Sequence, residues 1–168
     1  MNDDKMAALI ADLDHSDKPR IRAAVDALIP LAAAAPALAD ELNRLLDDSQ
    51  GRHPWPAAYI LAHLPRPSQR VFEALLNTLD HSDPDIRWAV MLLLVRLAKT
   101  DRGIAGLLHG LRETGTPTQR RMAIYCIRDL NFTDAASLQA LLDSLRDDDP
   151  TVRVAAVTSL KGRTEINS

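Results

Sequence analysis

The feature that most constrains this chain is an internal repeat with a period of 33 residues. Stepping through the sequence by that interval returns the same kind of apolar residue, and no insertion is needed. The clearest columns are Leu9, Leu42, Leu75, Leu108 and Leu141; Ala24, Ala57, Val90, Ala123 and Ala156; and Leu28, Leu61, Leu94, Ile127 and Leu160. Such a period predicts a stack of similar units, each of which buries its apolar face against its neighbours.

Inside each unit, apolar residues recur three, four or seven positions apart, which is the spacing of one face of an α-helix. Ala and Leu must build most of the core, because aromatic residues make up only 4% of the chain. Each unit is therefore expected to be two helices. We predict first helices at about 3–13, 37–46, 68–79, 102–111 and 134–145, and second helices at about 19–33, 55–65, 85–98, 118–130 and 151–162.

Polar turns rich in Asp separate the two helices of a pair, as at residues 14–17, 80–83 and 147–149. Their side chains can accept hydrogen bonds from the free N–H groups that begin the next helix. Proline follows in the first turn at Pro84, Pro117 and Pro150. Proline loses no hydrogen bond there, because the first N–H groups of a helix have no partner within it. These turns are predicted to start the second helices.

Helix pairs of this kind stack into an all-α fold, which we expect to be a right-handed α-solenoid of five two-helix repeats with a convex and a concave side. We expect a single domain over residues 1–168, with repeats at about 1–33, 34–66, 67–99, 100–132 and 133–163. The column Leu31, Leu64, Leu97 and Leu130 continues with Arg163, which is typical of a capping repeat that meets water.

Two segments carry a family likeness. Residues 79–90 read Leu-Asp-His-Ser-Asp-Pro-Asp-Ile-Arg-Trp-Ala-Val, and residues 145–156 read Leu-Arg-Asp-Asp-Asp-Pro-Thr-Val-Arg-Val-Ala-Ala. Over residues 3–162 the chain resembles HEAT repeats of the short type named after phycobilisome (PBS) lyases. The resemblance implies that helices beginning at Ile-Arg or Val-Arg line the concave side, where members bind partners. Ankyrin repeats share the period, but their Thr-Pro-Leu-His-x-Ala signature fails here after Thr116 and Pro117.

All Trp and Tyr residues lie on second helices, on the side away from the predicted core. At 100° per residue, Trp55 and Tyr59 lie about 160° from the core residue Ala57. With the positions one turn further on, they belong to three rows: Trp55, Tyr59 and His63; Trp88, Leu92 and Arg96; and Arg121, Tyr125 and Asp129. Because neighbouring helices pack about 8–10 Å apart, we expect one aromatic patch with mixed charge. We predict that this patch binds a partner protein or peptide.

Two other uses of these rings stay open at this stage. In a tightly curved solenoid the concave rings can pack on one another across the groove, so that they act as core. The same face can also form a homodimer.

The composition favours binding over catalysis. The net charge of −3 offers no general attraction to nucleic acid or anionic lipid, and no segment reaches the roughly 18 apolar residues of a membrane span. The single cysteine, Cys126, lies on the flank of the core stripe and is expected to be a small buried hydrophobe rather than a nucleophile. We therefore expect a cytoplasmic, non-enzymatic adaptor without a metal or cofactor.

The family resemblance raises three activities, of which the first is iron-dependent hydroxylation. Deoxyhypusine hydroxylases place iron-binding His-Glu pairs after the Val-Arg step, where this chain has Trp88-Ala89, Arg121-Met122 and Val154-Ala155. The loops that hold His15 and His81 are expected to be helix caps rather than metal sites.

A bilin lyase-like protein that acts on a tetrapyrrole or its carrier is the main alternative function. The aromatic rows would suit a flat tetrapyrrole, with Arg96 or Arg121 meeting its propionates. The third candidate is a nucleic-acid reader related in fold to DNA glycosylases, but only the fourth repeat has a basic excess.

Arg87, Arg120 and Arg153 recur one residue before the outward-facing position. Because Asp83 and Asp149 recur beside them, we predict a ladder of hydrogen bonds between repeats. These arginines would then be structural, whereas Arg121 would contact the partner.

Overall fold

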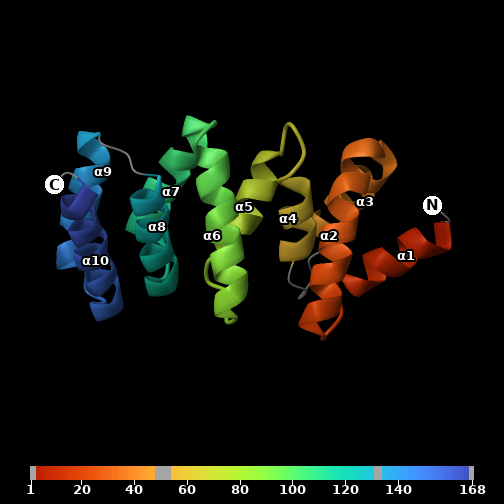
Figure 1. Cartoon of the computed structure of the whole chain (residues 1–168), viewed down its shortest axis with the longest axis horizontal. Helices are drawn as coiled ribbons and strands as arrows, with labels where there is room; N and C mark the ends of the chain where they lie inside the picture. The colour runs from red at the N-terminus through yellow and green to blue at the C-terminus, as the bar shows by residue number, and fades with distance from the viewer. Residues whose placement is uncertain (1–2, 48–53, 131–133, 167–168) are drawn as a thin grey trace. The chain divides into compact units, whose positions relative to one another are not determined.

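The computed structural model describes residues 3–47, 54–130 and 134–166, with side chains assigned from 4 to 161 within those ranges. These residues form α-helices and one 3₁₀ turn, and no strand occurs among them (Figure 1). The helices are α1 (Asp3–Asp12), α2 (Lys18–Ala34), α3 (Pro36–Asp47), α4 (Trp55–Leu61), α5 (Gln69–Thr78), α6 (Pro84–Ala98), α7 (Arg102–Thr114), α8 (Pro117–Asp129), α9 (Ala135–Asp143) and α10 (Pro150–Ile166), with the 3₁₀ turn η1 (Ser144–Arg146) after α9. The all-α fold is confirmed, and α1 with α2, α3 with α4, α7 with α8 and α9 with α10 pack as the predicted pairs.

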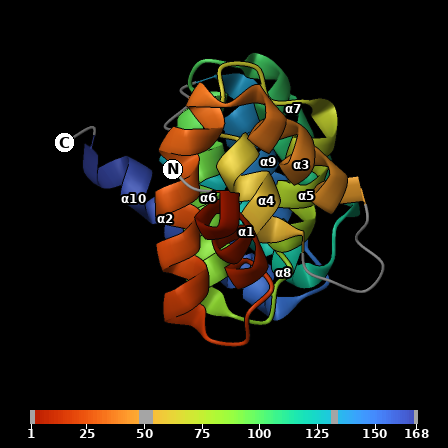
Figure 2. The same cartoon turned by 90° about the vertical axis from the view of Figure 1, so that its right-hand side faces the viewer.

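The chain divides into two compact units, residues 1–75 and 76–168, and the boundary falls inside α5. In the first unit, α1 packs on α2, and α4 packs on both α2 and α3 (Figure 2). In the second unit, α7 packs on α8 and α9 on α10, while α6, α8 and α10 lie side by side (Figure 1). Each unit thus stacks helix pairs as an α-solenoid does. The right-handed sense and the single domain stay predictions.

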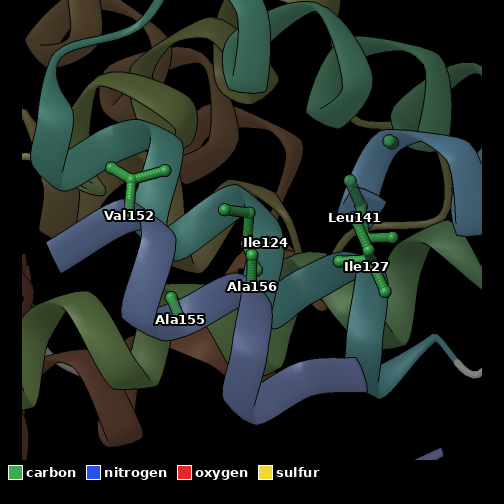
Figure 3. Close-up of a cluster of buried hydrophobic side chains, with 7 residues drawn as sticks. Ile124, Ile127, Leu141, Val152, Ala155 and Ala156 are labelled. Atoms are coloured by element: carbon green, nitrogen blue, oxygen red, sulfur yellow. The ribbon is translucent and has the colours of Figure 1, made fainter. Parts of the chain in front are cut away.

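The columns of the 33-residue repeat form the core. Leu42, Leu75, Leu108 and Leu141 have no exposed surface, and Ala123 and Ala156 of the second column are equally buried. In the second unit one cluster joins three helices (Figure 3), and its labelled side chains are Ile124 and Ile127 of α8, Leu141 of α9, and Val152, Ala155 and Ala156 of α10. The small alanines allow α10 to lie close to α8, so that the branched side chains fill the space between them.

Two of the three Asp-rich turns cap the next helix through a side chain, at α6 and α10, whereas Asp17 before α2 makes no side-chain cap bond. Asp83 caps α6 by accepting a hydrogen bond from the Asp85 backbone N–H at 2.8 Å. At α8, Thr116 and Gln119 form a reciprocal capping box. The Gln119 amide also donates to the backbone carbonyl of Leu76, so that one buried side chain both starts α8 and ties it to an earlier repeat.

Helix α4 ends at Leu61, four residues before the predicted end. Pro65 explains the difference, because proline has no N–H to donate to the Leu61 carbonyl and disfavours a helical conformation at Leu64. The Leu64 N–H instead bonds the Leu61 carbonyl three residues back, at 3.0 Å. At the other end of the chain, α10 continues to Ile166, and the side chain of the predicted capping residue Arg163 lies outside the described residues.

The recurring arginines tie each second helix to the turn before it. Arg87 donates to the Ser82 carbonyl at 3.0 Å, and Arg153 donates to the Asp148 carbonyl at 2.9 Å. These bonds lie within one repeat, so the predicted ladder between repeats is not formed by them.

The bond between repeats is made by Arg120. It donates to the Gly115 carbonyl in its own turn and to both carboxylate oxygens of Asp147, at 2.7 and 2.8 Å. Its acidic partner is thus Asp147 of the next repeat rather than Asp149, which caps α10 through the N–H of Thr151. Both side chains of this ion pair are largely buried.

Folding lowers the pKa of carboxyl groups in this region. The hydrogen bonds from the Arg120 guanidinium hold the pKa of Asp147 below its ordinary value. At the start of α9, the backbone N–H of Ser137 donates to Asp134 and lowers the pKa of that carboxyl group in the same way. Both groups are therefore more strongly ionised in the folded chain than in the unfolded chain.

The repeat column predicts a matched pair of core and surface substitutions on α7. Leu108→Ala should lower the free energy of unfolding by about 2–5 kcal/mol, because it leaves a cavity where Leu108 is fully buried. Leu107→Ala, at the exposed neighbouring position, should cost less than about 1 kcal/mol. Urea titration followed by circular dichroism measures both values. Equal losses for the two variants would contradict the assignment of the column to the core.

The ion pair predicts different roles for two adjacent arginines. Arg120→Ala should lower the free energy of unfolding by about 1.5–3 kcal/mol, because it leaves the Asp147 carboxylate largely buried without its partner. Arg121→Ala should change it by no more than about 0.5 kcal/mol. Thermal melts of both variants test this, and a melting temperature for Arg120→Ala equal to that of the parent would count against a structural ion pair.

Acid should destabilise the fold through the same carboxylates. A carboxyl group whose pKa is lowered by folding adds stability above its unfolded pKa of about 3.9, and this contribution disappears as the pH falls through the lower, folded value. The melting temperature should therefore be nearly constant from about pH 7 to pH 5 and decline below about pH 4. Asp147→Asn should melt lower at neutral pH and show a shallower acid decline. A parallel decline in both proteins would mean that Asp147 does not contribute to it.

Candidate binding surface

The second helices of the second unit expose large apolar side chains on one face. On α6, 43% of Trp88 and 59% of Leu92 are exposed, while most of the other apolar residues of this helix are buried. The two residues lie four positions apart and therefore on the same side of the helix. They are the outward-facing positions that the sequence predicted.

Trp88 contacts an aromatic residue of the neighbouring helix. Its indole stacks on the ring of Tyr125 from α8, with the ring centroids 5.6 Å apart and the planes 15° from parallel. Tyr125 is half-buried, and it also packs against the hydrophobic cluster of α8, α9 and α10. The repeat columns pair Trp88 with Arg121 and Leu92 with Tyr125, so the observed stack runs diagonally between the rows. This diagonal contact joins the two rows into one aromatic patch within the second unit.

Arg128 is a member of this patch that the sequence rows did not include. Its guanidinium carbon lies 5.1 Å from the centroid of the Tyr125 ring, which is the geometry of a cation–π contact. Its Nε also donates to Asp129, at 2.6 Å. The sequence spacing could have predicted this contact, because Arg128 follows Tyr125 by three residues and so lies beside it on the helix.

A hollow of about 330 Å³ adjoins the patch, and it is lined by Arg121, Tyr125, Pro150, Thr151 and Val154. Val154, at the start of α10, is 64% exposed. It occupies the same repeat column as Trp88 and Arg121, but the predicted rows do not include it. The apolar surface therefore continues from α6 across α8 to the first turns of α10.

The remaining charged positions of the predicted rows frame this surface. Arg96 is exposed in the last turn of α6. Asp129 ends α8 and is half-buried beside Arg128, with which it forms an ion pair. That Arg96 and Asp129 together form a charged edge of the patch stays a prediction.

The first unit carries the third row, Trp55, Tyr59 and His63, and all three side chains are half-buried. Trp55 begins α4 directly after Pro54. Tyr59 and His63 have their ring centroids 5.2 Å apart and tilted by 48°. That this row joins the patch of the second unit stays a prediction.

His63 has a local structural role. It lies beyond the early end of α4, and its Nδ1 donates to the backbone carbonyl of Tyr59 at 2.9 Å. Carbonyls in the last turn of a helix lack partners within the helix. The imidazole therefore caps α4 and holds itself beside the Tyr59 ring.

The two histidine loops are helix-start devices. His15 Nδ1 accepts a hydrogen bond from the backbone N–H of Asp17 at 2.9 Å, and His81 Nδ1 accepts one from that of Asp83 at 3.0 Å. Each ring thereby supports the turn before a second helix. Across the residues that the structure describes, no three His, Cys, Asp or Glu side chains gather closely enough to hold a metal ion.

Cys126 is fully buried in α8, as its position on the core flank predicted. Burial raises the pKa of its thiol far above the ordinary value. The thiol therefore stays protonated at neutral pH and packs as a small apolar group, which makes it unsuited to act as a nucleophile.

None of the helices in the described part of the chain combines the length and the hydropathy that a membrane crossing needs. No family model matches the chain, and neither does any curated protein.

Several solved structures are similar. One is an engineered protein determined by the Northeast Structural Genomics Consortium, with 18% identity, a TM-score of 0.45 and coverage of 95% of this chain and 78% of that chain. A second engineered protein from the same consortium has 18% identity, a TM-score of 0.43 and coverage of 95% and 80%. A designed armadillo repeat protein in complex with the peptide (KR)4 has 17% identity, a TM-score of 0.43 and coverage of 92% and 80%.

Proposed function

We propose that this protein is a non-enzymatic interaction module of the short HEAT type, which binds a segment of a partner protein on the exposed face of α6, α8 and α10. The observation that carries the proposal is the exposed Trp88 and Leu92 beside the stacked ring of Tyr125. The resemblance to short HEAT repeats supports the same choice, because it makes this helix face the concave, partner-binding side.

The physical argument rests on exposed apolar area that folding leaves uncovered. Burial of apolar surface is favourable by about 25 cal/mol per Å². Trp88 and Leu92 can gain this energy only when another molecule covers them, because both are exposed in the folded chain. Tryptophan and tyrosine are also the residues that most often dominate binding energy at interfaces. The stack holds Trp88 in place, which reduces the entropy lost on binding.

The surroundings define the segment that fits. An apolar anchor would cover Trp88 and Leu92, and a carboxylate of the partner would reach Arg121 at the wall of the hollow. An extended or helical peptide with an apolar side chain and at least one acidic group meets both requirements. Arg96 and Asp129 would contact the charged flank of this segment. Trp55, Tyr59 and His63 of the first unit are proposed as a further contact of the same kind.

Substitution of Trp88 should weaken partner binding about 30-fold or more, which corresponds to the loss of about 2 kcal/mol expected for a central aromatic residue. Proteins captured from the native host by the parent chain would be identified, and the dissociation constant of the recovered partner would then be measured for Trp88→Ala. Leu107→Ala removes a comparably exposed side chain from a first helix and should change affinity less than twofold. A folded Trp88→Ala variant that binds every partner as tightly as the parent would overturn the proposal.

Two inexpensive measurements separate the alternatives from this proposal. Visible absorbance after incubation with bilin reports tetrapyrrole binding. A mobility shift with DNA that weakens steeply as salt rises reports nucleic-acid binding. A clear signal in either measurement that Trp88→Ala abolishes would assign the patch to that ligand class instead of to a protein segment.

A further inference from the structure

Arg121 of α8 carries a positive charge that the fold does not use. Two other arginines of this helix are engaged, since Arg120 binds Asp147 and Arg128 binds Asp129. Arg121 makes none of the hydrogen bonds or ion pairs found among the residues that the structure describes. Its side chain is half-buried, so its charge is already partly withdrawn from water. A guanidinium in this state is well placed to bind a carboxylate from another molecule.

The hollow beside Arg121 offers apolar walls and one cation. Its described lining consists of four uncharged residues and one charged residue: Tyr125, Pro150, Thr151, Val154 and Arg121. The acid next to this lining, Asp149, accepts hydrogen bonds from the backbone N–H and the hydroxyl group of Thr151, at 2.8 and 2.5 Å. That carboxylate is therefore committed to the start of α10 rather than to Arg121.

This lining selects the chemistry of the side chain that enters. A short apolar stem with an anionic end fits both the walls and the cation, and aspartate and glutamate have this form. A basic side chain would place a like charge against Arg121. An apolar side chain would shut the guanidinium away from water without a counter-charge. Both of these cost free energy, so the hollow discriminates between partners as well as binding one.

The place of the hollow relative to the apolar residues sets a spacing along the partner. The hollow lies between α8 and α10, whereas Trp88 and Leu92 lie on α6. Neighbouring helices pack about 8–10 Å apart, so the hollow is about 12–15 Å from α6. An extended chain covers about 3.3 Å per residue, and its alternate side chains face the same surface. Side chains about four residues apart therefore reach both places.

We propose that the partner segment is extended and crosses α6, α8 and α10, with an acidic side chain in the hollow about four residues from its apolar anchor. This inference rests on the proposed function, because it defines the kind of segment that the same surface takes. Arg121 is then the residue that determines specificity. Trp88 and Leu92 supply the apolar contact.

Selection of peptides tests the inference without the natural partner. Random peptides of about 12 residues displayed on phage would be selected against the immobilised full chain and, in parallel, against Trp88→Ala and Arg121→Glu. Peptides that bind the parent chain but not Trp88→Ala should carry Asp or Glu about four residues from a large apolar residue. Arg121→Glu should instead select Lys or Arg at that position, because the charge at the hollow is reversed.

The affinity of one selected peptide, measured by fluorescence anisotropy, gives the size of the effect. Arg121→Glu should weaken the binding of the acidic peptide at least about tenfold. Replacement of the acid of the peptide by glutamine should weaken binding to the parent chain but change binding to Arg121→Ala less than about twofold, because the interaction is already lost there. Arg102→Glu makes the same change of charge at the exposed start of α7 and should leave the affinity within about twofold of the parent value.

The outcomes separate this inference from the proposed function. Peptides that depend on Trp88 but carry no acid at this spacing would overturn the inference and leave the proposed function standing. The same acid selected by Arg121→Glu, or an equal loss of affinity in Arg102→Glu, would also overturn it. A selection that yields no peptide dependent on Trp88 would overturn both. Circular dichroism and thermal melts of each variant establish that the fold is retained.

Discussion

The structure depends on one constraint: a pair of amphipathic helices cannot bury its own apolar stripe and must be covered by the next pair. Ala155 and Ala156 of α10 meet Ile124 and Ile127 of α8, and neither helix could keep these residues from water alone. Small residues on one helix and branched residues on its neighbour allow a close approach with few voids. Because this contact recurs every 33 residues, stability is distributed along the chain as a series of interfaces between neighbours.

The same constraint gives different positions on the helix surface different roles. Residues such as Leu108 and Leu141 must be apolar because packing surrounds them completely. Residues on the outer side of the second helices are not enclosed by packing, so folding constrains them less, and they are available for recognition. Trp88 and Leu92 occupy such positions, and large apolar groups there need a reason other than folding.

The sequence predicted the structure correctly where the interaction that decides it is local or recurs in every repeat. The helices begin and end within a few residues of the predicted places, since caps and prolines act over a single turn. It failed at α4, where the effect of Pro65 on the preceding turn outweighed the helical spacing of Leu61 and Leu64. It also assigned the wrong acidic partner to Arg120, because the choice between Asp147 and Asp149 depends on the path of a turn in the next repeat.

For the candidate surface, the sequence was enough to predict that Trp88 and Leu92 lie on the exposed side of α6, because helical periodicity fixes direction around the helix axis. It was not enough to establish which of those side chains meet. The diagonal stack of Trp88 on Tyr125, the approach of Arg128 to that ring and the inclusion of Val154 in the hollow follow from the offset between adjacent helices. That offset is set by how the side chains of α6, α8 and α10 interlock. It is a property of packing in three dimensions, so the repeated sequence pattern does not predict it.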